Sequence, residues 1–388
     1  MALTRRLFNL KIWGLGLGYF CFYLPYCALI KATTTGYLPG TGGPVKGFSI
    51  LPATVIATAV VLMSSATILG WWKYASRRQF FGVSVICPGR LVFLSGFGTA
   101  IIIGTTTIAY TFTGISILFA LLLMRGGVLI LAPVVDFFFG RRVRWFSWIA
   151  LALSLAALLL ALSDAQNYDM TLAAGLNITG YLAGYLLRLP CINKLAKSQD
   201  KNITYRYLVE EMTVASVVLL TIPAILAVIG EGSVMLELRA GFATLFSNSI
   251  TVHGLMIGAL YAGLYLFGTL IYLDARENTF CIPLNRGASL LAGVFATYVL
   301  ASLFTETLPS TAQLVGSSLI MIALLFLSPL HHGHRVARRV RHSLGVAYQA
   351  FMDDFNKQSP VPVTLAQTAL AEDVLLAADE EGFRRRSS

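Results

Sequence analysis

Long apolar segments separated by short polar stretches make up most of this chain. A segment of about 17 to 25 apolar residues is long enough to cross the hydrocarbon layer of a membrane as one helix. Ten segments of roughly this kind occur, and they cover residues 11–30, 49–72, 91–112, 113–139, 146–163, 173–191, 207–230, 251–273, 276–303 and 310–329. The pattern therefore predicts an all-α polytopic membrane protein with ten transmembrane helices.

The composition supports this interpretation over a soluble fold. Hydrophobic residues make up 56% of the 388 residues and charged residues only 12%, a balance typical of polytopic membrane proteins. The first apolar segment has no small-residue cleavage pattern before Lys31, so we expect a retained first helix and not a signal peptide.

Positive charge is distributed unevenly between the predicted loops. Ten spans with a cytoplasmic N-terminus put alternate loops in the cytoplasm, where Lys and Arg accumulate. Of the 29 Lys and Arg residues, only Lys31, Lys46 and Arg239 fall in predicted outside loops, while Arg125 and Arg286 fall within spans. We expect an integral, multi-pass protein with cytoplasmic N- and C-termini, in the plasma (inner) membrane if the source is bacterial. The loop bias explains the net charge of +11, so no nucleic-acid partner is expected.

Two local matches link the halves of the chain. They pair Gly18-Tyr19-x-x-x-Tyr23-Leu24 with Gly180-Tyr181-x-x-x-Tyr185-Leu186, and, at nearly the same offset, Arg125-Gly126 with Arg286-Gly287. The matches fall in predicted spans one and six and in spans four and nine. Because five is an odd number, two five-helix repeats must be inverted relative to each other. We predict a first repeat over residues 1–163, an inverted second repeat over 164–330 and a cytoplasmic tail over 331–388.

Arg125 and Arg286 are the candidate functional residues. A charge at the bilayer centre costs at least about 2.5 to 3.5 kcal/mol, so two at matching places suggest a shared, water-accessible pocket. Asp136, Glu210 and Glu211 fall near predicted cytoplasmic ends, where we expect ion partners or helix caps. The alternative is that each arginine bonds to backbone carbonyls or a distant carboxylate and only holds helices together.

The neighbours of these arginines favour an anionic ligand. Arginine binds phosphate or carboxylate through two oxygens at once, and its charge persists at any accessible pH. Helical spacing puts Ser289 on the face of Arg286, with Asn285 beside it. An aromatic wall could come from tyrosines spaced four residues apart, although packing or interfacial anchoring is the alternative for them. These are Tyr19, Tyr23, Tyr181, Tyr185, Tyr261 and Tyr265.

The sequence contains no pattern for metal or cofactor chemistry. The five cysteines lack metal-ligand spacing, and clustered carboxylates that would bind magnesium or act as a base are missing. We therefore expect no metal, no cofactor and no enzyme activity. Two alternatives stay open: an integral-membrane transferase whose arginines hold a lipid-linked diphosphate, and a non-transporting membrane scaffold.

The ten-helix pattern with paired halves and a basic ninth span resembles the drug/metabolite transporter superfamily over roughly residues 11–329. The closest likeness is to its EamA-like members and its nucleotide-sugar and sugar-phosphate branch. It is carried by Ile282-Pro283-Leu284-Asn285-Arg286 and then Leu291-Ala292-Gly293. By this resemblance, Asn285 and Arg286 would contact the phosphate or ribose part of a substrate. The asparagine-rich span-seven motif of nucleotide-sugar transporters has no counterpart here, which argues against such a substrate.

These observations predict a secondary transporter for a small organic anion or polar metabolite, phosphorylated or carboxylated. Inverted halves can adopt each other's conformations and so expose a shared central site to one side and then the other, which is alternating access. Exchange of one anion for another is favoured over proton coupling, because the sequence shows no carboxylate near the middle of a predicted span.

Overall fold

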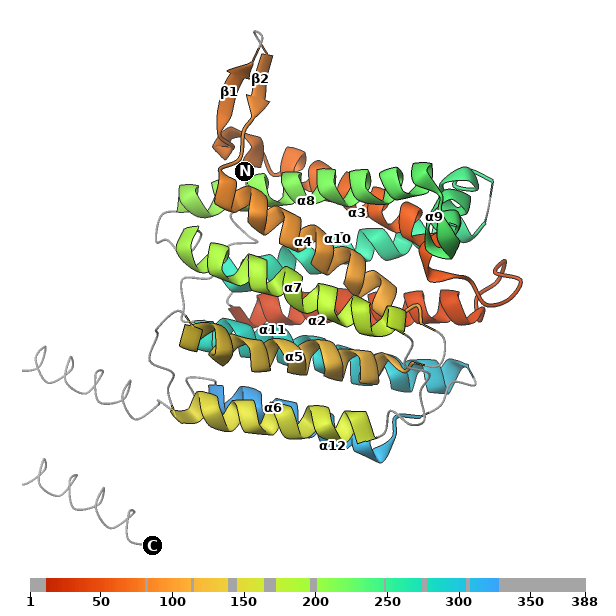
Figure 1. The fold of residues 1–388 in the computed structure, drawn as a ribbon, viewed down its shortest axis with the longest axis vertical. Helices are drawn as coiled ribbons and strands as arrows, with labels where there is room; N and C mark the ends of the chain where they lie inside the picture. The colour runs from red at the N-terminus through yellow and green to blue at the C-terminus, as the bar shows by residue number, and fades with distance from the viewer. Residues whose placement is uncertain are drawn as a thin grey trace, which may run out of the picture. The chain divides into compact units, whose positions relative to one another are not determined.

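The computed structural model describes residues 12–80, 83–112, 115–138, 145–163, 172–195, 201–247, 249–273, 278–304 and 308–327. Most of these residues are helical (Figure 1). The helices are α2 (Ile12–Thr35), α3 (Gly47–Ile68), α4 (Arg90–Ala109), α5 (Ile117–Phe138), α6 (Trp145–Ser163), α7 (Leu172–Leu195), α8 (Lys201–Ile229), α9 (Gly232–Ala243), α10 (Ile250–Leu273), α11 (Asn278–Leu303) and α12 (Thr311–Leu327). A 3-10 helix, η1 (Trp71–Tyr74), and an antiparallel hairpin, β1 (Arg77–Phe80) and β2 (Val83–Ile86), connect α3 to α4. The predicted tail, 331–388, lies outside the described residues.

Each of the ten apolar segments contains a helix. Six helices in the described part of the chain are long and apolar enough to cross a membrane: α2, α3, α4, α10, residues 202–229 of α8 and residues 284–303 of α11. Helices α5, α6 and α12 contain shorter apolar segments. The chain is therefore mostly helical with six candidate spans, which indicates a multi-pass integral membrane protein. Ten spans and an inverted repeat stay predictions.

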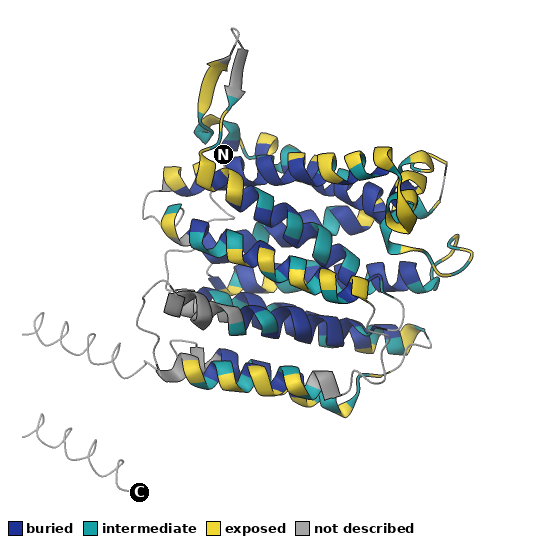
Figure 2. Ribbon diagram, in the orientation of Figure 1, coloured by how far each residue is buried: buried dark blue, intermediate teal, exposed yellow. Residues whose placement is uncertain are grey.

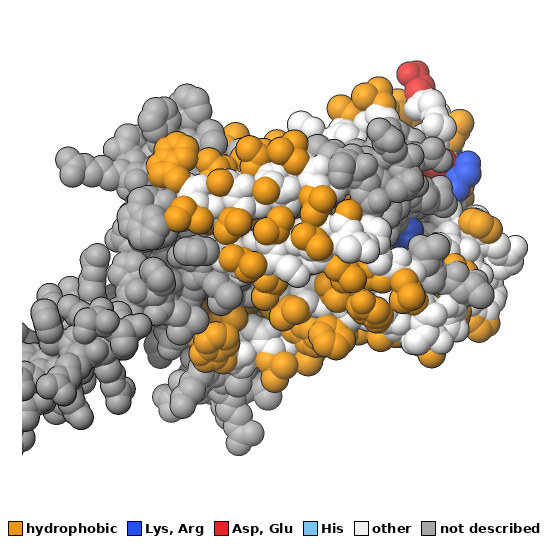
Figure 3. Space-filling model, turned by 90° about the horizontal axis from the view of Figure 1, so that it is seen from below, with side chains coloured by type: hydrophobic (Ala, Val, Ile, Leu, Met, Phe, Trp, Pro, Cys, Tyr) orange, Lys and Arg blue, Asp and Glu red, His pale blue; other side chains and the backbone are white. Residues whose placement is uncertain are grey.

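The outer faces of the helices are apolar. Helix α2 exposes Trp13 and Leu17, α8 exposes Val228, and α10 exposes Val252 and Met256. In Figure 2, exposed residues follow the outer faces while buried residues face neighbouring helices, and in Figure 3 apolar side chains spread over much of one face. Exposed apolar patches of this extent mark a surface that something covers, and for helices of this length the hydrocarbon of a bilayer fits.

The main helix contacts show a regular exchange between the two halves of the chain. Helix α4 packs against α7 and α10 against α2; α3 packs against α10 and α8 against α4; α2 packs against α11 and α7 against α5. The helices of the first half, in order, are α2, α3, α4, α5 and α6, and their counterparts in the second half are α7, α8, α10, α11 and α12. If every helix is exchanged with its counterpart, the two contacts in each of these three pairs change places. Other large contacts, α3 with α8, α5 with α11 and α6 with α12, each join a helix to its own counterpart in the other half.

Glycines allow α4 and α7 to approach closely. A β-carbon at Gly98 would lie 2.8 Å from the Gly184 carbonyl oxygen, and a β-carbon at Gly184 would lie 2.8 Å from the Gly98 oxygen. Small residues let membrane helices associate through close van der Waals packing. The contact holds α7, which carries Tyr181, Tyr185 and Arg188, in a fixed position against α4.

The structure corrects the predicted position of Lys31. The sequence places it in an outside loop, but α2 continues to Thr35 and the side chain is only 3% exposed. Its Nζ donates hydrogen bonds to the carbonyl oxygens of Ile115 at 2.7 Å and Phe112 at 3.3 Å. Carbonyl groups beyond a helix end lack helical partners, so a cation that bonds to them is stabilised when buried. Lys31 thereby ties α2 to the connection between α4 and α5.

Candidate functional site

The structure brings the two predicted arginines together. Arg125 from α5 donates a hydrogen bond to the Tyr181 hydroxyl at 2.5 Å, and Arg286 from α11 donates to the same hydroxyl at 3.1 Å. Arg125 also donates to the Tyr23 hydroxyl at 2.7 Å. Both arginines are buried, with exposed fractions of 2% and 0%. Four helices, α2, α5, α7 and α11, therefore supply one contiguous cluster, which we call the arginine–tyrosine cluster.

Aromatic rings cover the two charges. The Cζ atom of Arg286 lies 4.3 Å from the centre of the Tyr185 ring, and the Cζ atom of Arg125 lies 5.4 Å from Tyr23 and 5.7 Å from Tyr181. A cation above an aromatic face is stabilised by the ring quadrupole, and more so when water is excluded. The pairs Tyr181–Tyr185 and Tyr19–Tyr23 face the arginines because residues four apart share one side of a helix.

The positive charge of the cluster is not neutralised by a described carboxylate. The ion pairs in the described part of the chain are Lys46–Glu237, Arg188–Glu211 and Arg206–Glu210. The side chain of Asp136, predicted as an interfacial partner, lies outside the described residues. Among those described, the Nε atoms of Arg125 and Arg286 and the Nη2 atom of Arg286 are buried without a hydrogen-bond partner. Buried donors of a cation that lack a partner are costly, so this site is suited to an added anion.

A small cavity borders the cluster. Its volume is about 30 Å³, which accommodates one or two water molecules and no organic ion. It is lined by side chains from α2, α4, α5, α7, α10 and α11, among them Tyr19, Thr99, Thr106, Arg125, Tyr185, Arg188, Tyr261, Tyr265, Tyr272 and Asn285. A ligand larger than this cavity can enter only if these helices move apart.

The predicted binding residues divide into three groups. Tyr19, Tyr185, Tyr265, Asn285 and Arg125 line the cavity. Tyr23, Tyr181 and Arg286 lie against Arg125 or share a hydrogen-bond partner with it. Ser289 does not line the cavity, and its hydroxyl donates to the Arg286 carbonyl oxygen within α11 at 2.8 Å.

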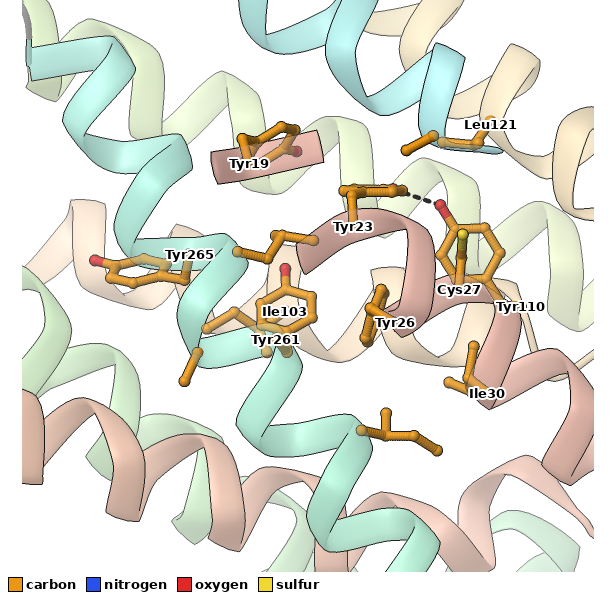
Figure 4. Packing of buried hydrophobic residues seen from close by; sticks show 14 of the residues in the cluster. Tyr19, Tyr23, Tyr26, Cys27, Ile30, Ile103, Tyr110, Leu121, Tyr261 and Tyr265 are labelled. Carbon is orange, nitrogen blue, oxygen red and sulfur yellow. Dashed lines mark hydrogen bonds between the residues drawn. The ribbon is translucent and has the colours of Figure 1, made fainter. Parts of the chain in front are cut away.

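Tyrosines extend the cluster toward the far end of α4. The hydroxyls of Tyr23 and Tyr110 are hydrogen-bonded at 2.5 Å, and Tyr26 donates to Thr107 at 3.2 Å. Figure 4 shows Tyr23 and Tyr110 joined in this way, with Tyr26 close by. Asn285 at the opposite side accepts a hydrogen bond from Tyr272 at 3.0 Å. The phenol groups thus provide a polar lining within an otherwise apolar helix bundle.

A buried ion pair next to the cavity was not predicted from the sequence. Arg188 donates from Nε to Glu211 at 2.8 Å and from Nη2 at 3.1 Å. The carboxylate also accepts from four hydroxyl groups at 2.9 to 3.0 Å, those of Ser95, Thr99, Tyr207 and Tyr265. Glu211 is fully buried and Arg188 is 4% exposed. The charge of Glu211 is thereby satisfied by its cation and its donors.

Glu211 is an ion partner as expected, but the predicted locations of these two residues are wrong because the helix ends differ from those expected. The sequence places Arg188 in a cytoplasmic loop and Glu211 at an interfacial helix start, whereas α7 continues to Leu195 and α8 begins at Lys201. Glu211 therefore lies about 15 Å inside α8. A signal was available: Tyr207 and Glu211, like Ser95 and Thr99, are polar residues four apart on one helix face. Glu210 forms the expected ion pair with Arg206 at 3.1 Å, although it too lies inside α8 and not at its start.

Comparisons with known proteins find likenesses to solved structures alone. No family model and no curated protein matches the chain. A solved structure described only as "Crystal structure of protein" superposes with a TM-score of 0.46 and 15% identity, over 81% of this chain and 96% of that chain. A likeness at this level supports no inference about family or activity, so the site is interpreted from its own geometry.

Proposed function

We propose that this protein is a secondary transporter that moves a small phosphorylated or carboxylated organic anion across the membrane by alternating access. The observation that carries the proposal is the meeting of Arg125 and Arg286 at one tyrosine hydroxyl, deep among helices and without a described carboxylate partner. Uncompensated charge inside a membrane is expensive and marks a ligand pathway. An anion of the right shape would supply the missing negative charge.

The chemistry of binding follows from the donors that lack partners. The Nε and Nη2 atoms of Arg286 and the Nε atom of Arg125 are available for a second acceptor. A phosphate or carboxylate engages two guanidinium donors at once, which favours these groups over a halide or a neutral solute. Asn285 and Tyr272 line the small cavity together with Arg125 and can bond to the remaining polar part of the substrate.

The helix packing supports a mechanism in which two halves rock around the site. If every helix is exchanged with its counterpart in the other half, the main contacts between the two halves are reproduced, as expected for an inverted repeat. We include ten membrane spans and this inverted repeat in the proposal. Membership of the drug/metabolite transporter superfamily is also proposed, on the ten-helix pattern and the motif at Asn285 and Arg286.

We propose two couplings for this transport. The preference for exchange assumes that no carboxylate lies mid-span, but Glu211 is fully buried about 15 Å inside α8. Its partner Arg188 also lines the cavity that Arg125 lines. The proposal therefore includes both anion exchange and proton-coupled transport, and the test measures uptake with and without a pH gradient.

The test starts with a thermal-shift screen of sugar phosphates, phosphorylated acids and dicarboxylates on the purified protein. Compounds that stabilise the protein are then assayed for uptake into liposomes. Truncating one partner of a buried, hydrogen-bonded charge contact costs about 2 to 5 kcal/mol, so Arg125→Ala and Arg286→Ala should each weaken binding about thirtyfold or more. Arg286→Lys should bind more weakly than the parent because it loses the planar pair of donors.

Arg239→Ala is the matched control. Arg239 donates to the carbonyl oxygens of Ala227 and Val228 near the end of α8 and does not line the cavity. The control should keep the thermal shift and the uptake of the parent. If a compound stabilises the Arg125→Ala/Arg286→Ala protein as strongly as the parent, its site is elsewhere and the proposed function is wrong.

A further inference from the structure

A second, much larger cavity lies where α4 begins, α7 ends and α8 begins. Its volume is about 560 Å³, compared with about 30 Å³ for the central cavity. It is open to the outside of the helix bundle and does not include the arginine–tyrosine cluster. We call it the α4–α8 groove. Residues that matter for its chemistry are Arg90, Leu91, Val92, Leu195, Ile203 and Arg206.

The walls of the groove are apolar. Leu91, Val92, Leu195 and Ile203 form them, and Leu91 and Ile203 remain 38% and 44% exposed. The walls belong to helices of which α4 and α8 are candidate membrane spans. An apolar depression beside candidate membrane-spanning helices fits a hydrocarbon chain, because acyl chains are the apolar material that surrounds such helices.

The rim of the groove is cationic. Arg90 is exposed, and no hydrogen bond or ion pair is found for it among the described residues. Arg206 uses its Nε atom for the ion pair with Glu210 at 3.1 Å, and its side chain is still 58% exposed. Gly89 precedes Arg90, provides no side-chain cap for α4 and belongs to the groove lining, so the start of α4 borders the groove. Arginines beside a helix start attract phosphate.

The groove lies at the end of the bundle where positive charge gathers. Lys73 in η1 and Arg77 and Arg78 in β1 belong to the connection that leads into α4, and Lys194 is in the last turn of α7. Figure 1 shows the hairpin next to the start of α4. The charge distribution predicts that this end faces the cytoplasm, where the membrane leaflet carries anionic lipids.

We propose that the α4–α8 groove binds one anionic phospholipid. Its phosphate lies between Arg90 and Arg206 at the start of α4, and an acyl chain lies along Leu91 and Ile203. Charge complementarity at the rim and the apolar walls together select this occupant over a free phosphate or a zwitterionic lipid.

A bound lipid would also stabilise the folded helix bundle. Tyr207 and Glu210 belong to the groove lining. Tyr207 bonds to Ser95 and donates to Glu211 at 3.0 Å, and Glu210 accepts from the Ser76 hydroxyl at 2.6 Å. An occupant therefore contacts residues that join α8 to α4 and to the connection between η1 and β1, and binding to the folded state alone would raise the melting temperature.

The test uses the purified full-length protein in a neutral detergent and does not depend on transport. Binding is measured by native mass spectrometry and by thermal shift with phosphatidylglycerol, phosphatidylcholine and glycerol 3-phosphate, each added separately. Phosphatidylglycerol should bind with defined stoichiometry and raise the melting temperature. A basic residue near an anionic headgroup contributes about a fivefold change in affinity, so Arg90→Gln/Arg206→Gln should weaken binding about twenty-fivefold.

Two further variants decide how a loss of binding is interpreted. Arg77→Gln/Arg78→Gln removes two exposed arginines that do not line the groove, and it should bind like the parent. Leu91→Trp keeps both arginines of the rim and fills the apolar wall, so it should weaken lipid binding. The proposal would be overturned if phosphatidylcholine bound as tightly as phosphatidylglycerol, or if glycerol 3-phosphate raised the melting temperature as much as phosphatidylglycerol. It would also be overturned if Arg77→Gln/Arg78→Gln lost as much lipid affinity as Arg90→Gln/Arg206→Gln.

Discussion

Replacing Glu211 by leucine tests how the helices around the cavity are held together. The substitution removes the negative partner of Arg188 and leaves a charged guanidinium buried among α4, α7, α8 and α10. It also deletes the acceptor for the Ser95, Thr99, Tyr207 and Tyr265 hydroxyls. Breaking a buried ion pair on one side costs about 3 to 5 kcal/mol. We expect the folding equilibrium to fall at least a hundredfold, since about 1.4 kcal/mol corresponds to a factor of ten.

The assay is reversible unfolding in mixed micelles, in which increasing dodecyl sulfate unfolds the protein and circular dichroism reports helix content. The comparison variant is Arg188→Met/Glu211→Leu, which removes both charges. Replacing a whole buried pair by apolar side chains is often nearly neutral, so the double variant should be more stable than Glu211→Leu alone. The ion-pair account would be refuted if Glu211→Leu cost less than about 1 kcal/mol of unfolding free energy. It would also be refuted if the loss of stability in the double variant equalled the sum of the losses in Glu211→Leu and Arg188→Met measured separately.

Three further predictions concern the fold and the cluster. Tyr181→Phe removes the hydroxyl that both arginines share and should cost about 1 to 3 kcal/mol in the same unfolding assay; an unchanged stability would contradict the shared hydrogen bonds. Gly98→Ala should lower the melting temperature because its β-carbon meets the backbone of α7, whereas Gly104→Ala, where nothing lies within 4 Å, should not. Lys31→Met should cost about 1 to 3 kcal/mol, because two carbonyl groups lose their donor, and the control Lys46→Met at an exposed position should cost much less.

The sequence alone determined where most of the described helices are and which charges stand out, although α9 falls in a stretch predicted as a loop. Helix positions could be predicted because the length and hydrophobicity of a span are local properties of the chain. The importance of Arg125 and Arg286 could be predicted because a charge within an apolar segment is conspicuous without any knowledge of its neighbours. The repeated Tyr19–Tyr23 and Tyr181–Tyr185 spacing also identified residues that surround these arginines in the structure.

Helix ends were predicted less well, and the errors have one cause. The sequence predicts a loop for Lys31 and a helix start for Glu211, because charged residues normally mark the end of an apolar span. In the structure, each charge is buried because it has partners on other helices: the Phe112 and Ile115 carbonyls for Lys31, and Arg188 for Glu211. A hydropathy pattern contains no information about such partners.

Only the tertiary structure decided which polar groups meet. Arg125 and Arg286 share the Tyr181 hydroxyl because α5, α7 and α11 converge, and Glu211 is satisfied because α4, α7, α8 and α10 converge around it. The glycines at positions 98 and 184 set how closely α4 and α7 approach, and thereby the position of Tyr181 and Arg188. The size of the central cavity depends on these helix distances as well. Sequence spacing fixes which residues share a helix face, whereas packing between helices fixes which faces meet.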